Sequence, residues 1–173
     1  LAVRDLNAGL DYQLHYDALV LSPGAAPIVP PIPGAERGLV LRDIEDLDRM
    51  VGELAKAQNV VVVGGGFIGL EAAENLKEAG LEVTLVELGD QLLAPLDPEM
   101  AMPLERELRR HGVKVELGHS VVEIEAGTAT LDDGRTVNAD LVVFAIGVRP
   151  DGRLAADAGL ALGPRGGIVV DDE

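Results

Sequence analysis

The sequence predicts an α/β fold: a parallel sheet with helices on both faces and a small antiparallel β-meander inserted between its later strands. Three observations lead to this prediction. Hydrophobic residues make up 47% of the 173 residues and aromatic residues only 2%, which is typical of a sheet rich in Val, Leu and Ile that is buried between helices. Strand and helix patterns alternate from residue 44 to residue 117. Short strands separated by polar turns follow, before one more apolar strand returns.

The amino-terminal part contains a strand pair and a connector. Residues 1–22 include "LDYQLHYDALVLS", which alternates and then becomes apolar, and so predicts a strand pair. The next stretch, "PGAAPIVPPIPG", has five prolines in twelve residues, which excludes a helix or central strand and indicates an extended boundary segment. After it, apolar residues recur at helical spacing at Ile44, Leu47, Val51 and Leu54.

The parallel sheet is predicted from the elements that follow. We expect a strand near 60–64, a helix near 67–79 that stops at Gly80, and a strand over 82–87. Toward the end of the chain, "VKVEL" predicts a strand, and residues 120–138 predict the meander, with turns at "EAGT" and "DDGR". "DLVVFAIG" predicts another buried strand, and "RLAADAGLAL" a short helix or turn.

A further helix is predicted to begin at Asp97 and Pro98, a capping residue followed by a first-turn proline. Pro103 is expected to bend or locally break this helix. Basic residues that suit the negative end of the helix dipole, and a glycine that ends the helix, lie at Arg109, Arg110, His111 and Gly112.

The stretch "VVVVGGGFIGLEAAENL" indicates a nucleotide site. Its glycines form G-x-G-x-x-G: Gly64 makes the tight turn, Gly66 lets a pyrophosphate approach the backbone, and Gly69 lets the helix pack closely on the strand. Free amides at the helix start, together with the helix dipole, then hold the pyrophosphate. Glycine turns also occur at ordinary strand–helix corners, so the motif alone is weak. The strand before it and the helix after it are those of a Rossmann-like dinucleotide site.

Glu87 narrows the choice of dinucleotide. It ends the strand that follows the motif, where a carboxylate accepts hydrogen bonds from the adenosine ribose and repels a 2′-phosphate. No Lys or Arg lies between Lys77 and Arg106, so NAD(H) is favoured over NADP(H). The alternative interpretation of Glu87 is a solvated strand end. FAD uses the same turn and often the same acid, so these residues alone do not separate FAD from NAD(H).

Charge and composition exclude several other classes of protein. Thirty acidic residues against fourteen basic ones give a net charge of −16, which disfavours nucleic acid and anionic membranes as partners. The absence of Cys excludes disulfides and a Cys nucleophile, and no apolar run reaches the ~20 residues of a membrane span. No metal site or catalytic triad is indicated, and His15, His111 and His119 are interpreted as structural.

Four motifs, in this order, resemble the pyridine nucleotide–disulfide oxidoreductase family, in particular its coenzyme A-disulfide reductase and NADH oxidase branch: "YDALVLSPGAAPIVPPIPG", "VVVGGGFIGLEAAENL", "EVTLVE" and "LVVFAIGVRPD". The resemblance covers almost the whole chain. It implies an FAD-binding domain that is interrupted by an NAD(H)-binding domain, with Gly64 in the NAD(H) fingerprint. It assigns residues 1–26 to the end of the FAD-binding domain and a connector, 27–147 to the NAD(H)-binding domain, and 148–173 to a return segment.

The resemblance also implies residue roles. The pyrophosphate would be lined by Gly64, Gly65, Gly66, Phe67, Ile68 and Gly69. Phe67 matches a position where relatives often carry a Tyr whose ring covers the flavin; the alternative is a core aromatic. Glu71 would lie near the nicotinamide carboxamide, or be a solvated first-turn acid. Gly147 would let the cofactor approach, or form a plain strand-end turn. Ser22 and Gly24 would contact FAD.

Several parts of the resembled enzymes are missing. The chain has neither the amino-terminal FAD fingerprint, nor the later flavin-binding Gly-Asp segment, nor the redox-active Cys, and both of its ends look cut from something longer. The expected function is the NAD(H)-binding domain of a cytoplasmic flavoprotein, which presents NADH for hydride transfer to FAD and is inactive alone. The intact enzyme would be a homodimer, with disulfide, dioxygen, nitrite and ferredoxin all open as electron acceptors. The alternative is a stand-alone, non-catalytic nucleotide-binding or sensing module.

Overall fold

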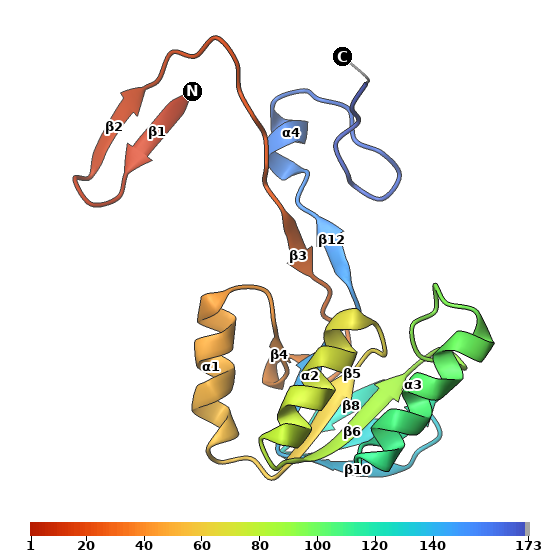
Figure 1. Cartoon of the computed structure of the whole chain (residues 1–173). Helices are drawn as coiled ribbons and strands as arrows, with labels where there is room; N and C mark the ends of the chain where they lie inside the picture. The colour runs from red at the N-terminus through yellow and green to blue at the C-terminus, as the bar shows by residue number, and fades with distance from the viewer. Residues whose placement is uncertain (172–173) are drawn as a thin grey trace. The chain divides into compact units, whose positions relative to one another are not determined.

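The computed structural model describes residues 1–171, which divide into two units (Figure 1). The first unit combines residues 1–24 with the chain from residue 150 onward, and the second comprises residues 25–149. None of the helices in the described residues is long and apolar enough to cross a membrane.

The centre of the second unit is a five-stranded parallel sheet. Its order is β4 (Leu39–Val40), β11 (Leu141–Phe144), β5 (Asn59–Val63), β6 (Glu82–Glu87) and β7 (Lys114–Leu117). The chain runs from β5 through β6 to β7 in one direction, whereas β11 returns to the other side of β5. The strand order therefore reverses at β5, and the carboxyl ends of β5 and β11 flank a crevice of the kind that binds ligands in such sheets.

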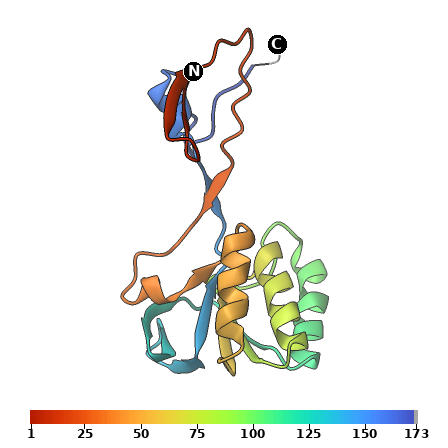
Figure 2. The same ribbon diagram turned by 90° about the vertical axis from the view of Figure 1, so that its left-hand side faces the viewer.

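Both faces of this sheet are covered by apolar side chains. Val60 and Val62 belong to the cluster on one face, and Val61 and Val63 to the cluster on the other. The first face packs against α1 (Ile44–Leu54), α2 (Phe67–Glu78) and α3 (Pro98–Arg110) (Figure 2). The second packs against an antiparallel sheet of β8 (Val121–Glu125), β9 (Gly127–Leu131) and β10 (Thr136–Ala139).

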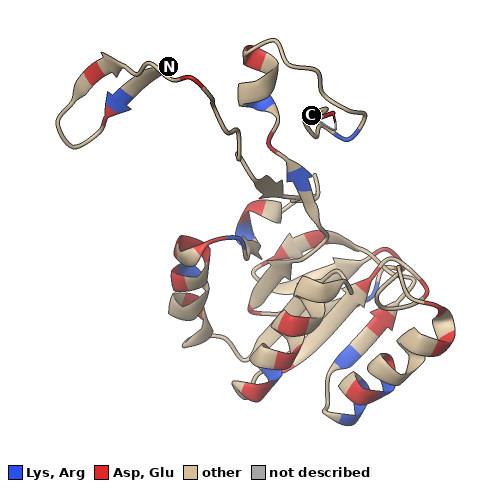
Figure 3. Cartoon of the chain, turned by 45° about the horizontal axis from the view of Figure 1, so that its top comes forward, with Lys and Arg blue, Asp and Glu red and all other residues tan. Residues whose placement is uncertain are grey.

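The fold class predicted from the sequence is confirmed, but in one detail it is wrong: the α-helices do not cover both faces. The connection from β7 to β11 passes through the three antiparallel strands, and these supply the apolar cover that a crossover helix supplies elsewhere. Val121, Ile124 and Leu131 of this meander are buried against the sheet. Acidic side chains lie on all three helices (Figure 3).

The helix α3 begins at Pro98 with Asp97 as its N-cap, as predicted, although the Asp97 side chain makes no capping hydrogen bond. It continues unbroken through Pro103, so of the predicted bend or local break, the break is wrong. The proline ring removes only the N–H that pairs with the carbonyl four residues earlier, at Glu99. Because Glu99 and Pro103 are both exposed, water can bond that carbonyl instead.

The helix α1 forms where the spacing of apolar residues predicts it, and the Asp43 carboxylate caps it by accepting a hydrogen bond from the Asp46 N–H at 2.9 Å. The residue that anchors it, however, is Met50, which is 4% exposed, whereas Ile44 and Val51 are 74% and 57% exposed. The apolar stripe predicted from the sequence therefore faces partly away from the sheet.

The Asp140 carboxylate joins the start of β11 to the start of β5. It accepts hydrogen bonds from the backbone N–H groups of Asn59 and Gln58 at 2.8 and 3.0 Å, and from the Asn59 side chain at 3.1 Å. These bonds, above all the one from the Asn59 backbone, hold the pKa of Asp140 below its ordinary value of 3.8.

This pKa shift predicts a pH dependence of stability. Because the folded-state pKa is lowered, the stabilisation is present above the ordinary pKa and is lost as the pH falls through the folded-state value. We expect the urea midpoint of the wild type to fall more steeply below about pH 4 than that of Asp140→Asn, which cannot titrate. Parallel losses in the two proteins would show that Asp140 contributes nothing to the acid sensitivity.

The rest of the structure is less regular. The strand β3 (Ala25–Pro27) pairs with β12 (Val148–Pro150), and a 3₁₀ turn, η1, spans Ala35–Arg37. In the first unit, β1 (Ala2–Asp5) and β2 (Leu10–Gln13) form an antiparallel hairpin, and α4 spans Arg153–Asp157. The strand pair predicted from "LDYQLHYDALVLS" is present only in part, because only Leu10–Gln13 of this stretch is a strand and its partner is Ala2–Asp5.

The apolar segment at 17–22, predicted to be strand, is not one. No strand of the described residues pairs with it, and its side chains stay open to solvent: Leu19 and Val20 are 45% and 87% exposed. A strand needs a neighbour for its backbone hydrogen bonds, and this segment has none.

Candidate functional site

A cleft of about 820 Å³ opens in the second unit at the carboxyl ends of the parallel strands. Its walls are formed by residues at or just after the carboxyl ends of four of these strands. They are residues 63–68 at the end of β5, 86–88 at the end of β6, 119–121 after β7 and 145–147 after β11, together with Pro30, Ala94 and Pro95. The residues that the sequence predicts to bind the pyrophosphate thus lie in one cleft with Glu87 and Gly147, except Gly69, which lies just behind the glycine turn.

Two of the motif glycines are required by close packing. Gly64 has a φ of +111°, and a Cβ placed on it would lie 2.5 Å from the carbonyl oxygen of Ala145. A Cβ on Gly69 would collide with the carbonyl oxygen of Gly64. The Ala145 N–H donates to the Val63 carbonyl at 2.7 Å, which holds the end of β11 against the turn. These two glycines therefore shape the turn and need not touch a ligand.

Gly66 differs from both of them. It is the N-cap of α2, with an extended backbone at φ −82°, and a Cβ placed on it would have no atom within 4 Å. Gly66 lines the cleft, and the position that a side chain would take there is unoccupied by protein atoms. The first N–H groups of a helix have no partner within the helix and carry its positive dipole end. A pyrophosphate therefore fits the first turn of α2 both sterically and electrostatically.

The Glu87 carboxylate is tied to the glycine turn. It accepts hydrogen bonds from the Gly65 N–H at 2.5 Å and from the Gly89 N–H at 2.7 Å, one on each oxygen. The alternative that it is merely a solvated strand end is wrong, because it is partly buried and holds two backbone groups. A carboxylate can accept about four hydrogen bonds, so each oxygen keeps a lone pair for a hydroxyl in the cleft.

The side chains at the start of α2 face the cleft. Phe67 and Ile68 line it and are 72% and 44% exposed. The alternative that Phe67 is a core aromatic is therefore wrong. Gly147 also lines the cleft, and its φ of +102° is a conformation that side-chain-bearing residues avoid.

Besides Gly69, three predicted site residues do not line the cleft. Glu71 is exposed in the second turn of α2, where its carbonyl and carboxylate accept from the Asn75 side-chain amide at 2.8 and 3.3 Å. Ser22 and Gly24 belong to the first unit, in which the Gly24 carbonyl accepts from the Asp151 N–H at 3.0 Å. Their roles stay predictions.

The sequence analysis misses one wall of the cleft, made of His119, Ser120 and Val121. The signal was available: residues that follow the carboxyl ends of parallel strands line the crevice of such sheets, and "GHS" follows the strand "VKVEL" directly. The scatter of the three histidines along the sequence carries no information about which of them follows a strand.

Comparison with known proteins identifies the family to which this chain belongs. Residues 2–173 match the family described as pyridine nucleotide-disulphide oxidoreductase. The NAD(P)H nitrite reductase large subunit of Klebsiella oxytoca is 40% identical over 98% of the chain, which spans 18% of that relative.

Two solved structures are similar over nearly the whole chain. Reduced CoADR-RHD of Bacillus anthracis is 41% identical with a TM-score of 0.90, covering 95% of this chain and 31% of its own. The water-forming NADH oxidase of Lactobacillus brevis, bound to NADH, is 30% identical with a TM-score of 0.88, covering 99% of this chain and 39% of its own. The chain thus spans less than half the length of these relatives. It belongs to the pyridine nucleotide-disulphide oxidoreductase family.

Proposed function

We propose that the second unit is an NAD(H)-binding domain, and that its cleft presents NADH for hydride transfer to FAD in an intact oxidoreductase. The observation that carries the proposal is the combination in one cleft of open space at Gly66, at a helix start, with the two acceptor oxygens of Glu87. These are the two groups that a dinucleotide needs, one for its pyrophosphate and one for its adenosine ribose.

The side chains around Glu87 support a preference for NADH over NADPH. Its carboxylate accepts hydrogen bonds from ribose hydroxyls, and it repels a 2′-phosphate. Among the described residues, no Lys or Arg lines the cleft to offset that repulsion. The NADH-bound oxidase of Lactobacillus brevis, which is similar over 99% of the chain, supports the same choice.

The nicotinamide end is assigned to the opposite wall. Nicotinamide supplies the hydride and FAD accepts it when both are bound. Gly147 leaves room beside β11 for the planar ring to approach, and Phe67 offers an exposed aromatic face at the cleft. We further propose that residues 27–147 form the NAD(H)-binding domain. Residues 1–26 would then be the end of an FAD-binding domain and a connector, and 148–173 a return segment toward that domain. Exposed apolar side chains in the first unit, such as Leu6 and Val20, both 87% exposed, support a role in packing against further polypeptide.

Glu87→Gln tests the proposed cofactor choice. The variant removes the charge while keeping the shape of the side chain, and it loses charge-assisted hydrogen bonds to the ribose. We expect the dissociation constant for NADH to rise about tenfold and that for NADPH to change little, so that the preference narrows. The measurement is a calorimetric titration of the 173-residue chain with each nucleotide.

Glu82→Gln is the matched control, because Glu82 begins the same strand at the end away from the cleft and pairs with Lys77. It is expected to bind both nucleotides as the wild type does. An unchanged ratio of the two dissociation constants in Glu87→Gln would overturn the assignment of Glu87.

The chain alone should not oxidise NADH when FAD is added. Robust turnover would contradict the proposal that this unit binds NADH while another domain binds FAD.

A further inference from the structure

His119 lies beside Glu87 at the edge of the cleft. The strands β6 and β7 are parallel neighbours, with Glu87 paired to Leu117 in register. Two backbone bonds continue this pairing beyond the strands: the Gly118 N–H donates to the Gly89 carbonyl at 2.8 Å, and the His119 N–H donates to the Glu87 carbonyl at 3.1 Å. Both Glu87 and His119 line the cleft. His119 is therefore held at the end of the cleft to which the adenosine ribose is assigned.

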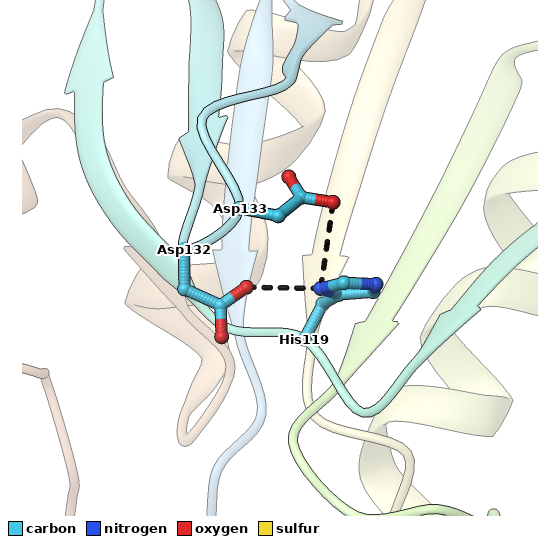
Figure 4. Close-up of side chains that lie close together, drawn as sticks. All are labelled: His119, Asp132 and Asp133. Atoms are coloured by element: carbon cyan, nitrogen blue, oxygen red, sulfur yellow. Dashed lines mark hydrogen bonds and ion pairs between the residues drawn. The ribbon is translucent and has the colours of Figure 1, made fainter.

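The orientation of the His119 ring is set by the turn between β9 and β10. Its Nδ1 lies 2.9 Å from the Asp132 carboxylate and 3.8 Å from that of Asp133 (Figure 4). The Asp132 N–H in turn donates to the Ser120 carbonyl at 3.0 Å, which fixes the turn next to the ring. The hydrogen bond from His119 is the main cause that lowers the pKa of Asp132.

Other charges nearby are already paired. His119, Asp132 and Asp133 each offer an atom of a kind that ligates metal ions, and these atoms lie within 4.8 Å of one another. However, Arg135 donates to Asp133 at 2.6 Å and to Glu116 at 2.9 Å. The guanidinium thus neutralises Asp133, and we interpret the group as a hydrogen-bond network. The charged groups around His119 are Asp132 and Asp133 from the turn, with Arg135 behind them, and Glu87 from the adjacent strand.

This arrangement determines which hydrogen bond His119 offers. A carboxylate at Nδ1 keeps the proton on that nitrogen when the ring is neutral, because a carboxylate can only accept. The second nitrogen, Nε2, points away from both carboxylates (Figure 4). Neutral His119 therefore offers an acceptor at Nε2, whereas protonated His119 offers a donor and a positive charge.

We propose that His119 is a second specificity-determining residue for the adenosine end of the cofactor. Its neutral Nε2 accepts a hydrogen bond from a donor of NADH, a ribose hydroxyl or the adenine amine. A 2′-phosphate has acceptor oxygens and negative charge, so it suits only the protonated ring. Discrimination against NADPH is accordingly stronger with the neutral ring than with the protonated ring. The inference rests on the proposed function, because it assigns a role within the same cleft.

The test compares the dissociation constants of NADPH and NADH at pH 8 and pH 6, measured by calorimetry on the 173-residue chain. In the wild type, the dissociation constant of NADPH divided by that of NADH should be smaller at pH 6 than at pH 8. The factor by which this ratio falls should be at least about threefold larger in the wild type than in His119→Gln, whose amide does not titrate. The 2′-phosphate of NADPH titrates in the same range with the wild type and with His119→Gln. Comparing the two proteins therefore cancels its contribution.

His111→Gln is the matched control. His111 has the same kind of environment, with its Nδ1 3.4 Å from the Glu107 carboxylate, but it ends α3 and lies outside the cleft. It should behave as the wild type does. An equal fall of the ratio in His119→Gln and the wild type would overturn the role of His119 while leaving the proposed function intact. No NADH binding by the wild type at either pH would overturn both.

A second measurement needs no variant at position 119. In ¹⁵N spectra of the wild-type histidines, assigned with the help of His111→Gln, the Nε2 resonance of His119 should shift when NADH is added. His119 resonances that do not change when either nucleotide is added would contradict the proposal, even if His119→Gln does not fold.

Discussion

Replacing Gly66 with Ala is expected to leave the fold intact and to weaken NADH binding by a factor of about 30 to 100. The backbone at Gly66 is extended, with φ −82°, so Ala adopts it without strain. A Cβ there meets no protein atom within 4 Å. It occupies the space in front of the first turn of α2, where it keeps the pyrophosphate from the helix amides. Loss of about 2 to 2.7 kcal/mol of charge-assisted hydrogen bonding gives the stated factor.

The same titration on Gly52→Ala provides the control. Gly52 lies within α1, and a Cβ placed on it would likewise have no atom within 4 Å. Ala at this helix position is expected to raise stability by up to about 1 kcal/mol and to leave NADH affinity unchanged. If Gly66→Ala binds NADH as tightly as Gly52→Ala does, the pyrophosphate does not lie at the start of α2.

Replacing Gly64 with Ala is expected to destabilise the second unit by roughly 3 kcal/mol. Two costs combine at this position. The φ of +111° is a conformation that side-chain-bearing residues avoid, and the new Cβ would lie 2.5 Å from the Ala145 carbonyl oxygen. Because this carbonyl belongs to the backbone at the end of β11, relief requires β5 and β11 to separate. Thermal unfolding should show a fall in Tm of about 10 °C.

Gly80→Ala separates the two costs. Gly80 follows α2 with a φ of +90°, yet a Cβ there would have no atom within 4 Å. Only the conformational cost applies, so we expect a loss of about 1 kcal/mol. Equal losses for the two variants would mean that close contact between the turn and β11 does not matter.

The sequence predicts this second unit well because its signals are local. The run Val60–Val63 leads into the glycine turn, and Glu87 ends the next strand at the expected distance. Each follows from a rule that needs only neighbouring residues. The hydrogen bond that ties Glu87 to Gly65 is not of this kind, since 22 residues separate the two and only the pairing of β5 with β6 brings them together.

The failures have a common physical cause in tertiary context. Pro103 stays within a helix because its freed carbonyl partner at Glu99 is exposed to solvent. The segment at 17–22 has strand-forming residues but no strand beside it in the described chain. His119 enters the cleft because β7 ends beside β6, a fact about strand order that its own sequence neighbourhood does not contain.

The central claim is that the cleft at the carboxyl ends of β5, β6 and β11 binds NADH through the first turn of α2. The most direct test is calorimetric titration of the 173-residue chain and of Gly66→Ala with NADH and, separately, with FAD. We expect one NADH bound per wild-type chain, binding at least about 30-fold weaker in Gly66→Ala, and no FAD bound at this site. FAD binding that Gly66→Ala abolishes, or NADH binding that it leaves unchanged, would show that the first turn of α2 is not an NADH site.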